Sequence, residues 1–427
     1  MTQTTEATAV RHRHPTGLYV LFFTELWERY SFYSMMAILT LYMDEALHFP
    51  ADRIGTIYGG YIAGVYFMPL IGGTLADRVI GFNRAVIIGG VLMCLGHFVL
   101  AIESLPFFYS ALVLLAVGTG MLKPNVSTIV GNLYRDRPEL RDAGYNIFYM
   151  GINLGALVSP LGVAWLRAHY GWSVAFGSAG IAMLISIAVF IGGNRHIAEA
   201  ARKIEAGSVE ARIDRATARA RVVALLVILV LACVFWIAFY QNGFTLTFWA
   251  RDNTTTAIAP EIFQSVEPFF VVALTPLLVT AWRMLRDRGR EPETVTKLLI
   301  GMGFVAVAYA LMGVAGRIGG DTGRVSSAWL VTTYALIAIG EVCLSPMGLS
   351  LVNKVAPPRM RGLMMGAWFL TLSIGGYLAG RVGGDYWESL THSTFFFGVT
   401  AAVVAAAVLL LIVVQWVRPT ITAAEHP

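Results

Sequence analysis

The stretch that decides the fold is TELWERYSFY, residues 24–33, because it carries three charges inside an apolar run that extends over about 17–43. That run exceeds the ~20 residues that a helix needs to cross a bilayer. On a helix, Glu25, Glu28 and Arg29 share one face. A charge at the bilayer centre costs ~2.5–3.5 kcal/mol or more, so this face must point to a protein interior or a wet cavity. A purely structural Glu–Arg pair that joins helices remains the alternative.

Composition supports a membrane protein. Of the 427 residues, 57% are hydrophobic and 13% are charged, and the mean hydropathy is +0.67. Soluble proteins carry about 25% charged residues. The net charge of +5 does not indicate nucleic-acid binding, since the basic residues are spread through short loops between apolar segments. We therefore predict an all-α polytopic membrane protein.

The apolar runs predict twelve transmembrane helices in two groups of six. We place them near 16–44, 53–79, 84–102, 107–132, 142–168, 172–193, 220–250, 261–285, 297–315, 327–355, 361–384 and 391–417. The polar segment that divides the two groups is rich in Ala, Glu and Arg. The predicted organisation is a cytoplasmic tail (1–15), an N-terminal six-helix bundle (16–193), a cytoplasmic linker (194–219), a C-terminal six-helix bundle (220–418) and a second tail (419–427).

The distribution of basic residues predicts the orientation. With both termini in the cytoplasm, 23 of the 31 Lys and Arg residues fall on the cytoplasmic side and six on the other. The remaining two, Arg29 and Lys123, lie within spans. Positive charge favours the cytoplasmic side of a membrane. We therefore expect the N-terminus and the C-terminus to be cytoplasmic.

Nothing in the sequence indicates catalysis or a metal site. The cysteines lie singly in apolar runs, and three thiols form no disulfide framework: they are Cys94, Cys233 and Cys343. The histidines show no paired pattern of metal ligands. The polar first 15 residues lack the apolar region of a cleaved signal peptide. We expect a protein without catalytic residues, metal or cofactor, and not an enzyme.

The loop after the second predicted span reads GGTLADR (residues 72–78), followed by Gly81 and Arg84. The glycines permit close helix approach, and Asp77 with Arg78 can tie the loop to a helix end. Together with six plus six spans, this string resembles the loop signature of the major facilitator superfamily. The resemblance implies the major facilitator fold.

Two further spans of the first group carry polar residues. Lys123 precedes a proline in the fourth span, and a carboxylate of the Glu25/Glu28 face is its natural partner. A lysine that extends to the membrane surface is the alternative. Asn153 in the fifth span is either a contact between helices or a ligand contact.

The second group carries acidic and aromatic candidates. Glu341 and Ser345 share a helix face in the tenth span, where a lone carboxylate indicates a functional site. Glu267 begins the eighth span and is either a pocket residue or a solvated interfacial carboxylate. Trp236 and Tyr240 are spaced i,i+4 in the seventh span, which is more typical of packing. Trp368 in the eleventh span either caps a pocket or packs.

These motifs together resemble the proton-coupled oligopeptide transporter family. The strings that carry the resemblance are ELWER (25–29), GGTLADR (72–78), KPNVS (123–127), FYMGINLG (148–155) and EVCLSPMGLS (341–350). The resemblance implies a proton-coupled symporter, driven by the proton gradient without a cofactor, that imports di- and tripeptides or similar molecules across a plasma or inner membrane. We expect a monomer, because two bundles already enclose the transport path. It assigns proton coupling to Glu25, Glu28, Arg29 and Lys123. It assigns substrate contacts to Tyr33, Tyr61, Lys123, Asn153, Glu341, Ser345 and Trp368, with Glu341 meeting the substrate's amino terminus.

The sequence departs from that family pattern at four positions. Phe32 replaces a tyrosine, and Met36 stands where many members have an arginine that binds the peptide carboxylate. Tyr240 stands where those members carry a glutamate that pairs with the arginine, so both halves of one ion pair are absent. Glu267 replaces an asparagine. We expect a retuned pocket that favours peptide-like, amine-bearing compounds, with a proton-linked drug or metabolite exporter of the same superfamily as the alternative.

Overall fold

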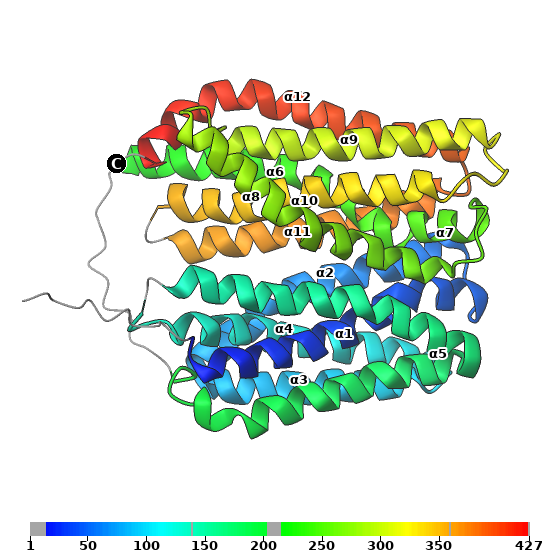
Figure 1. Cartoon of the computed structure of the whole chain (residues 1–427), viewed down its shortest axis with the longest axis horizontal. Helices are drawn as coiled ribbons and strands as arrows, with labels where there is room; N and C mark the ends of the chain where they lie inside the picture. The colour runs from blue at the N-terminus through cyan, green and yellow to red at the C-terminus, as the bar shows by residue number, and fades with distance from the viewer. Residues whose placement is uncertain (1–13, 138–139, 203–214, 358–359, 426–427) are drawn as a thin grey trace, which may run out of the picture.

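The computed structural model describes residues 14–137, 140–202, 215–357 and 360–425 (Figure 1). Within these ranges the chain is helical, and its only extended pairing is an isolated bridge between Thr254 and Val325. The predicted tails and linker lie partly outside the described residues. The last helix continues to Glu425, into the predicted second tail, and α6 begins at Arg215 within the predicted linker.

The helices follow the predicted apolar runs to within a few residues. The first part of the chain contains α1 (Thr16–Glu45), α2 (Ala51–Leu75) with the π-turn η1 (Ala76–Ile80), α3 (Phe82–Leu100), α4 (Leu105–Asn132), α5 (Arg141–Gly192) and η3 (Asn194–His196). The second contains α6 (Arg215–Phe239), η4 (Tyr240–Gly243), α7 (Thr245–Asp252), η5 (Pro260–Ser265), α8 (Val266–Asp287), α9 (Thr294–Ile318), α10 (Ala328–Val355), α11 (Arg361–Tyr386) and α12 (His392–Glu425).

Helix α5 is two helices joined at a glycine. Its 52 residues would extend about 78 Å as a straight helix, whereas the apolar part of a bilayer is ~30 Å thick. The backbone reverses at Gly171, which has φ +81° and ψ −175°. Glycine adopts this conformation without steric cost. The reversal lies between the predicted spans 142–168 and 172–193.

The predicted span 220–250 is interrupted, which is a correction to the sequence prediction. Helix α6 ends at Phe239, and a short 3-10 turn, η4, separates it from α7. Partners from other helices satisfy carbonyl groups at the break. The Thr40 hydroxyl donates to the Gly243 carbonyl at 2.9 Å, and the Tyr58 hydroxyl donates to the Tyr240 carbonyl at 2.9 Å. Backbone breaks at membrane depth are tolerated where other protein groups satisfy them.

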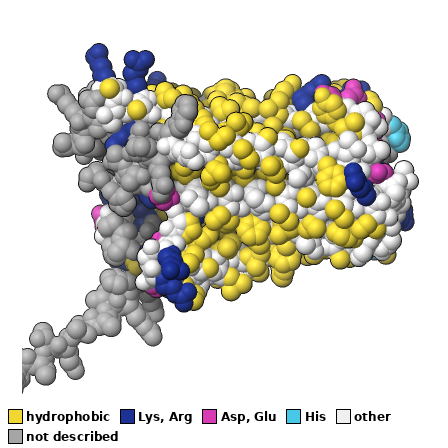
Figure 2. Space-filling model, turned by 90° about the horizontal axis from the view of Figure 1, so that it is seen from above, with side chains coloured by type: hydrophobic (Ala, Val, Ile, Leu, Met, Phe, Trp, Pro, Cys, Tyr) yellow, Lys and Arg dark blue, Asp and Glu magenta, His cyan; other side chains and the backbone are white. Residues whose placement is uncertain are grey.

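The exterior is that of a multi-pass membrane protein. Ten helical segments of the described residues are long and apolar enough to cross a membrane, one of them being Ala143–Gly192, and α1 with its three charges is not among them. Figure 2 shows hydrophobic side chains over the flank of the molecule, with charged side chains gathered towards its two ends. An apolar flank between charged ends matches a bilayer between two aqueous phases.

The helices form two groups, and the first group lies below the second in Figure 1. Helices α1 to α5 pack together, as do α6 to α12. The main contacts between groups join α2 to α11, α5 to α8 and η5, and α1 to η4 and η5. We call the end where α1 begins and α12 ends the terminal end, and the opposite end, with α7 and the Gly171 turn, the far end.

Glycines allow α2 and α11 to touch. A Cβ atom at Gly380 would lie 2.1 Å from the Gly55 carbonyl oxygen and 2.7 Å from Gly59 Cα. A Cβ atom at Gly384 would lie 3.0 Å from Asp52 Cα. Small residues of this kind permit backbone contact between membrane helices. The contact joins the first half of α2 to the second half of α11.

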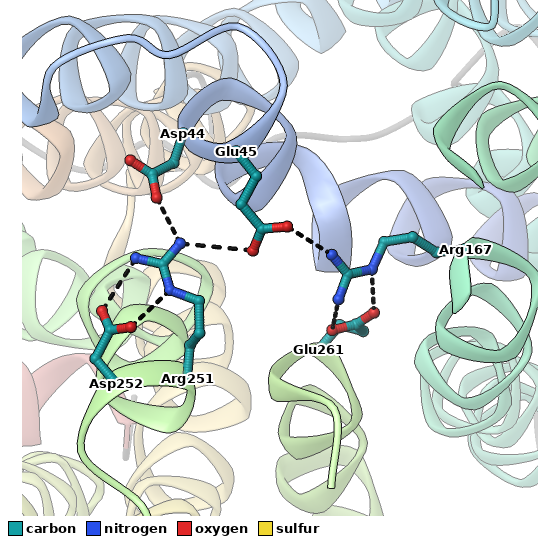
Figure 3. Close-up of polar contacts among 6 residues, drawn as sticks. All are labelled: Asp44, Glu45, Arg167, Arg251, Asp252 and Glu261. Carbon is teal, nitrogen blue, oxygen red and sulfur yellow. Dashed lines mark hydrogen bonds and ion pairs between the residues drawn. The ribbon is translucent and has the colours of Figure 1, made fainter. Parts of the chain in front are cut away.

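Ion pairs at the far end also join the two groups (Figure 3). Arg167 of α5 donates to Glu261 of η5 at 2.7 Å and to Glu45 of α1 at 2.9 Å. Arg251 of α7 pairs with Asp44 and lies 3.5 Å from Glu45, so that Glu45 contacts both arginines. Arg251 also pairs with its neighbour Asp252 at 2.8 Å. We call these six residues the far-end network.

We predict that Gly380→Ala destabilises the protein. The added methyl group would clash with backbone atoms of α2, and overpacking costs about 1–3 kcal/mol. The control is Gly60→Ala, on α2 but away from α11, because no atom lies within 4 Å of a Cβ at Gly60. Thermal unfolding in detergent should show a lower Tm for Gly380→Ala and an unchanged or higher Tm for Gly60→Ala. An equal change in Tm for both variants would contradict the close contact between α2 and α11.

We predict an asymmetric double-mutant cycle in the far-end network. Glu261 is fully buried, so Arg167→Gln leaves a buried carboxylate without its cation, at a cost of up to about 3–5 kcal/mol. Glu261→Gln costs less, since Arg167 retains Glu45. Adding Glu261→Gln to Arg167→Gln should therefore recover stability in thermal unfolding. Additive effects of the two substitutions would rule out this coupling.

Candidate functional site

The three charged residues in the first half of α1 form one buried cluster. Glu25, Glu28 and Arg29 are 1%, 0% and 2% exposed. Arg29 donates from Nε and one Nη to the two carboxylate oxygens of Glu28, and its Nε lies 3.4 Å from Glu25 Oε1. The second oxygen of Glu25 is buried and has no hydrogen-bond partner. One guanidinium thus compensates the charge of two carboxylates, and one oxygen of Glu25 is left without a hydrogen-bond donor.

Helix α5 closes the cluster on one side. A Cβ atom at Gly155 would lie 2.5 Å from the Leu26 carbonyl oxygen and 2.9 Å from Arg29 Cβ. The glycine therefore lets α5 lie directly against the charged turn of α1 and exclude water from it. Low-dielectric surroundings strengthen the interaction between the remaining charges.

Lys123 lies near this cluster but makes no direct ion pair. Its Nζ lies 5.1 Å from the centre of the Tyr66 ring, and among the described residues no carboxylate lies within 4.0 Å of it. Its charge nevertheless acts on the Glu25 carboxylate. Lys123 is half-buried on α4, next to Pro124. The predicted partners therefore share one region, with Arg29 alone in direct contact with the carboxylates.

A cavity of about 70 Å³ lies between the two groups of helices. It has room for a few water molecules, whereas sites for drug-sized ligands span about 300–1,000 Å³. Two predicted site residues, Tyr33 and Tyr240, line it, and so do Phe32 and Met36. The positions that lack the family's ion pair, Met36 and Tyr240, therefore meet at one cavity.

Four polar residues of this cavity lie outside the predicted site: Tyr58, Tyr66, Asn242 and Gln264. The helical spacing of Tyr58, Ile62, Val65 and Tyr66 on α2 is a signal that could have identified the first two. Asn242 belongs to the break η4, and its exposure to the cavity depends on that break. Gln264 donates to the Ala37 carbonyl of α1 at 3.3 Å.

Two predicted contacts lie beside the cavity lining. Tyr61 of α2 is 5% exposed, its hydroxyl has no hydrogen-bond partner, and the charges of Arg29 and Glu28 act on it. Asn153 of α5 donates to the Tyr149 carbonyl of its own helix at 2.9 Å. Tyr61 thus faces the charged cluster, while the amide of Asn153 is engaged within α5.

The two predicted tryptophans pack against other helices. Trp368 is 2% exposed and fills the space left by Gly348, where a Cβ atom would lie 1.9 Å from its ring. Trp236 is equally buried, and its ring lies 6.4 Å from that of Trp368 in an edge-to-face arrangement. Its indole nitrogen has no partner. Of the two interpretations that the sequence left open for Trp368, this geometry favours packing.

The acidic residues of the second group lie together. Glu267, in the first turn of α8, is 7% exposed, and its carboxyl group lies close enough to Glu341 on α10 for their charges to interact. Glu267 is therefore a buried residue and not a solvated carboxylate. Ser345 lies one turn beyond Glu341 and is half-buried. We call Glu267 and Glu341 the carboxyl pair.

The carboxyl pair faces residues of the first group. Its charges act on Tyr33 of α1 and on Tyr149 of α5. Tyr149 is 43% exposed although it faces the pair from the opposite group of helices. The site as a whole thus has a Glu–Arg–Lys region on one side and an acidic pair on the other.

Comparison with known proteins identifies the family. The model described as the POT family matches residues 83–213 and 199–384. The peptide transporter YePEPT of Yersinia enterocolitica is 32% identical, with 87% of this chain and 88% of that protein covered. A di-/tripeptide transporter of Lactococcus lactis subsp. cremoris is 31% identical, with 83% and 86% covered.

Solved structures match over nearly the whole chain. A peptide transporter POT in complex with alafosfalin has a TM-score of 0.87 at 30% identity, with 95% of this chain and 96% of that chain covered. A POT family transporter in complex with 5-aminolevulinic acid has a TM-score of 0.88 at 25% identity, with 95% and 97% covered. This chain therefore belongs to the POT family and is a multi-pass membrane transporter.

Proposed function

We propose that this protein is a proton-coupled symporter that imports short peptides or peptide-like, amine-bearing compounds by alternating access. The observation that carries the proposal is the buried Glu25–Glu28–Arg29 cluster, with Lys123 close by and an acidic pair across the cavity. Relatives named as peptide transporters, one of them a di-/tripeptide transporter, support the substrate class. A catalytic role is not part of the proposal, because the family consists of transporters.

The proposed topology has twelve spans in two six-helix bundles. Adding α1 to the ten candidate segments, and counting the two arms of α5 separately, gives this number. Both chain ends lie at the terminal end, and the excess of Lys and Arg supports a cytoplasmic location there. The far end then faces the outside of a plasma or inner membrane.

The proposed proton coupling depends on unequal pairing in the buried cluster. Arg29 alone offsets two carboxylates in direct contact, and Glu25 keeps an oxygen without a partner. A proton on Glu25 or Glu28 removes one negative charge from the region in which Lys123 lies. The Lys123 ammonium is then free to bind the carboxylate of a substrate. Proton and substrate carboxylate thereby favour each other's binding, as reciprocal coupling requires.

The proposed transport cycle separates the two groups of helices alternately at each end. The far end is held by Arg167–Glu261, by Arg251–Asp44 and by the glycine contacts of α2 and α11. Opening to the outside breaks both ion pairs.

The proposed selectivity follows from the charged residues of the candidate site and from the uncharged lining of the cavity. Met36 and Tyr240 provide no cation for a substrate carboxylate, which leaves Lys123 for that role. Glu267 and Glu341 add negative charge on the other side. The site therefore favours ligands with an ammonium group and no extra carboxylate. Amine-bearing ligands fit this pattern, and a related structure contains 5-aminolevulinic acid.

We predict that Lys123→Gln reduces proton-driven uptake at least about tenfold, because a charge-assisted hydrogen bond is worth ~1.5–3 kcal/mol. Uptake of labelled dialanine into proteoliposomes with an imposed pH gradient measures this. Lys297→Gln is the matched control, since Lys297 pairs with Glu291 in the terminal-end loop at 2.6 Å. Full proton-driven uptake by Lys123→Gln would contradict the coupling scheme, and outward flux of substrate against inward protons would favour an exporter.

We also predict a charge preference in competition assays. Lysyl-alanine should inhibit uptake of labelled dialanine roughly tenfold more strongly than glutamyl-alanine, which corresponds to ~1.4 kcal/mol. Glu267→Gln should reduce this preference because it removes one acidic group from the site. If acidic dipeptides compete best and Glu267→Gln has no effect, the proposed selectivity is wrong.

A further inference from the structure

A second, larger cavity lies at the terminal end, between the end of α4 and the beginning of α5. Its volume is about 560 Å³, which falls within the ~300–1,000 Å³ of typical ligand sites. It shares no lining residue with the small cavity between the two groups of helices. Its lining residue Tyr134 is hydrogen-bonded through its hydroxyl to His14 Nδ1 at 2.8 Å, just before α1 begins. We call it the α4–α5 cavity.

The lining of the α4–α5 cavity is basic. Arg135 and Arg141 both line it, and no Asp or Glu does. In the described part of the chain, no carboxylate lies within 4.0 Å of either guanidinium. A guanidinium is always charged and carries five N–H donors in a planar fork. The cavity therefore contains two cations without an acidic partner.

The beginning of α5 adds further donors. Arg141 is the first residue of α5, and the preceding Leu140 provides no side-chain cap. The backbone N–H groups of the first helical turn have no acceptor within the helix. Such a turn favours an anion through these groups and through the helix dipole.

Packing between α4 and α5 fixes the shape of the cavity. The Tyr145 hydroxyl donates to the Ser127 carbonyl of α4 at 3.1 Å. A Cβ atom at Gly144 would lie 2.3 Å from the Tyr134 ring, so this glycine lets the ring lie against α5. A Cβ atom at Gly131 would lie 3.4 Å from Arg141 Nη2, so the guanidinium reaches the backbone of α4. Both helices thus hold the cavity walls.

The cavity lies at the level of lipid headgroups. Helix α4 has 28 residues and is therefore about 42 Å long, close to the ~40–45 Å of a bilayer with its headgroup layers. Its end at Asn132, which also lines the cavity, falls in one of these layers. Basic pockets between membrane helices bind the headgroups of anionic lipids.

We infer that the α4–α5 cavity binds the headgroup of an anionic phospholipid, with its phosphate group between Arg135 and Arg141. Arginine suits this group because its planar fork bonds two phosphate oxygens at once. The inference goes beyond the proposed transport function, since it names a second partner at a place away from the substrate site. A free phosphate ion has the same chemistry, and the position in the headgroup layer favours the lipid.

A bound headgroup would connect the ends of α4 and α5. Ser127 of the lining lies one helical turn from Lys123, the lysine of the proposed coupling scheme. The lipid would therefore restrain a helix that takes part in the proposed proton coupling. Because it binds the folded protein, it should also raise the Tm.

The first test titrates the purified protein in detergent with short-chain dihexanoyl phosphatidylglycerol. Arg135→Gln/Arg141→Gln should bind it at least about tenfold more weakly, because charge-assisted hydrogen bonds are lost. The matched control, Arg283→Gln/Arg288→Gln, removes two exposed arginines at the end of α8 and should bind as the wild type does. Equal weakening in both double variants would assign the binding to general surface charge and overturn the inference.

The second test leaves both arginines in place. Thr128 lines the cavity and is exposed, so Thr128→Glu adds a carboxylate there with little effect on packing. Phosphatidylglycerol should raise the Tm of the wild type and of Thr128→Gln above the value in dihexanoyl phosphatidylcholine, and should not do so for Thr128→Glu. The same Tm change in all three proteins, or none in the wild type, would contradict the site.

The source of the phosphate is tested by competition on the wild type. Inorganic phosphate and glycerol 3-phosphate should displace phosphatidylglycerol only at concentrations far above that of the lipid, because neither carries the acyl chains that the bilayer retains. Displacement by inorganic phosphate at an equal concentration would identify a site for free anions, and the lipid assignment would then be wrong.

Discussion

The contact between Arg29 and the carboxylates of Glu25 and Glu28 is the constraint on which the arrangement depends. Three charges at membrane depth are tolerated only where protein, and not lipid, surrounds them. Gly155 lets α5 lie against this turn, and α1 therefore packs chiefly on α5. The remaining faces of α1 are then free to meet η4 and η5 of the second group. The charged turn thus fixes both the centre of the first group and the surface that it presents to the second.

The sequence predicts the helices and the charged cluster well, because both depend on local spacing. Apolar runs define the helix positions, and i,i+4 spacing brings Glu25 and Arg29 together. The break at Tyr240–Gly243 could not be predicted from local spacing, since it depends on hydroxyl groups of Thr40 and Tyr58, about 200 residues away in the chain. The burial of Trp368 likewise depends on the space beside Gly348 on another helix. The roles of the predicted site residues remain predictions.

Both groups of helices contain buried acidic side chains, but the neighbours of these side chains differ. In the first group a guanidinium compensates two carboxylates, whereas in the second no basic nitrogen of the described residues lies within 4.0 Å of Glu267 or Glu341. Replacing the family's arginine and glutamate by Met36 and Tyr240 removes charge from the cavity between them. Removing both partners of a buried ion pair is far less costly than removing one. In the proposed selectivity, the acidic residue at Glu267 then favours cationic substrates.

Glu45 has a consequence for how the far end opens. Because its carboxylate touches both Arg167 and Arg251, the two bridges between the groups share a member. Loss of one bridge changes the electrostatic surroundings of the other, so the bridges separate cooperatively and not one after the other. The far end is therefore expected to open in one step, once the ion pairs have been weakened enough. The far end then responds as a single unit to ionic strength, which screens partly exposed charges.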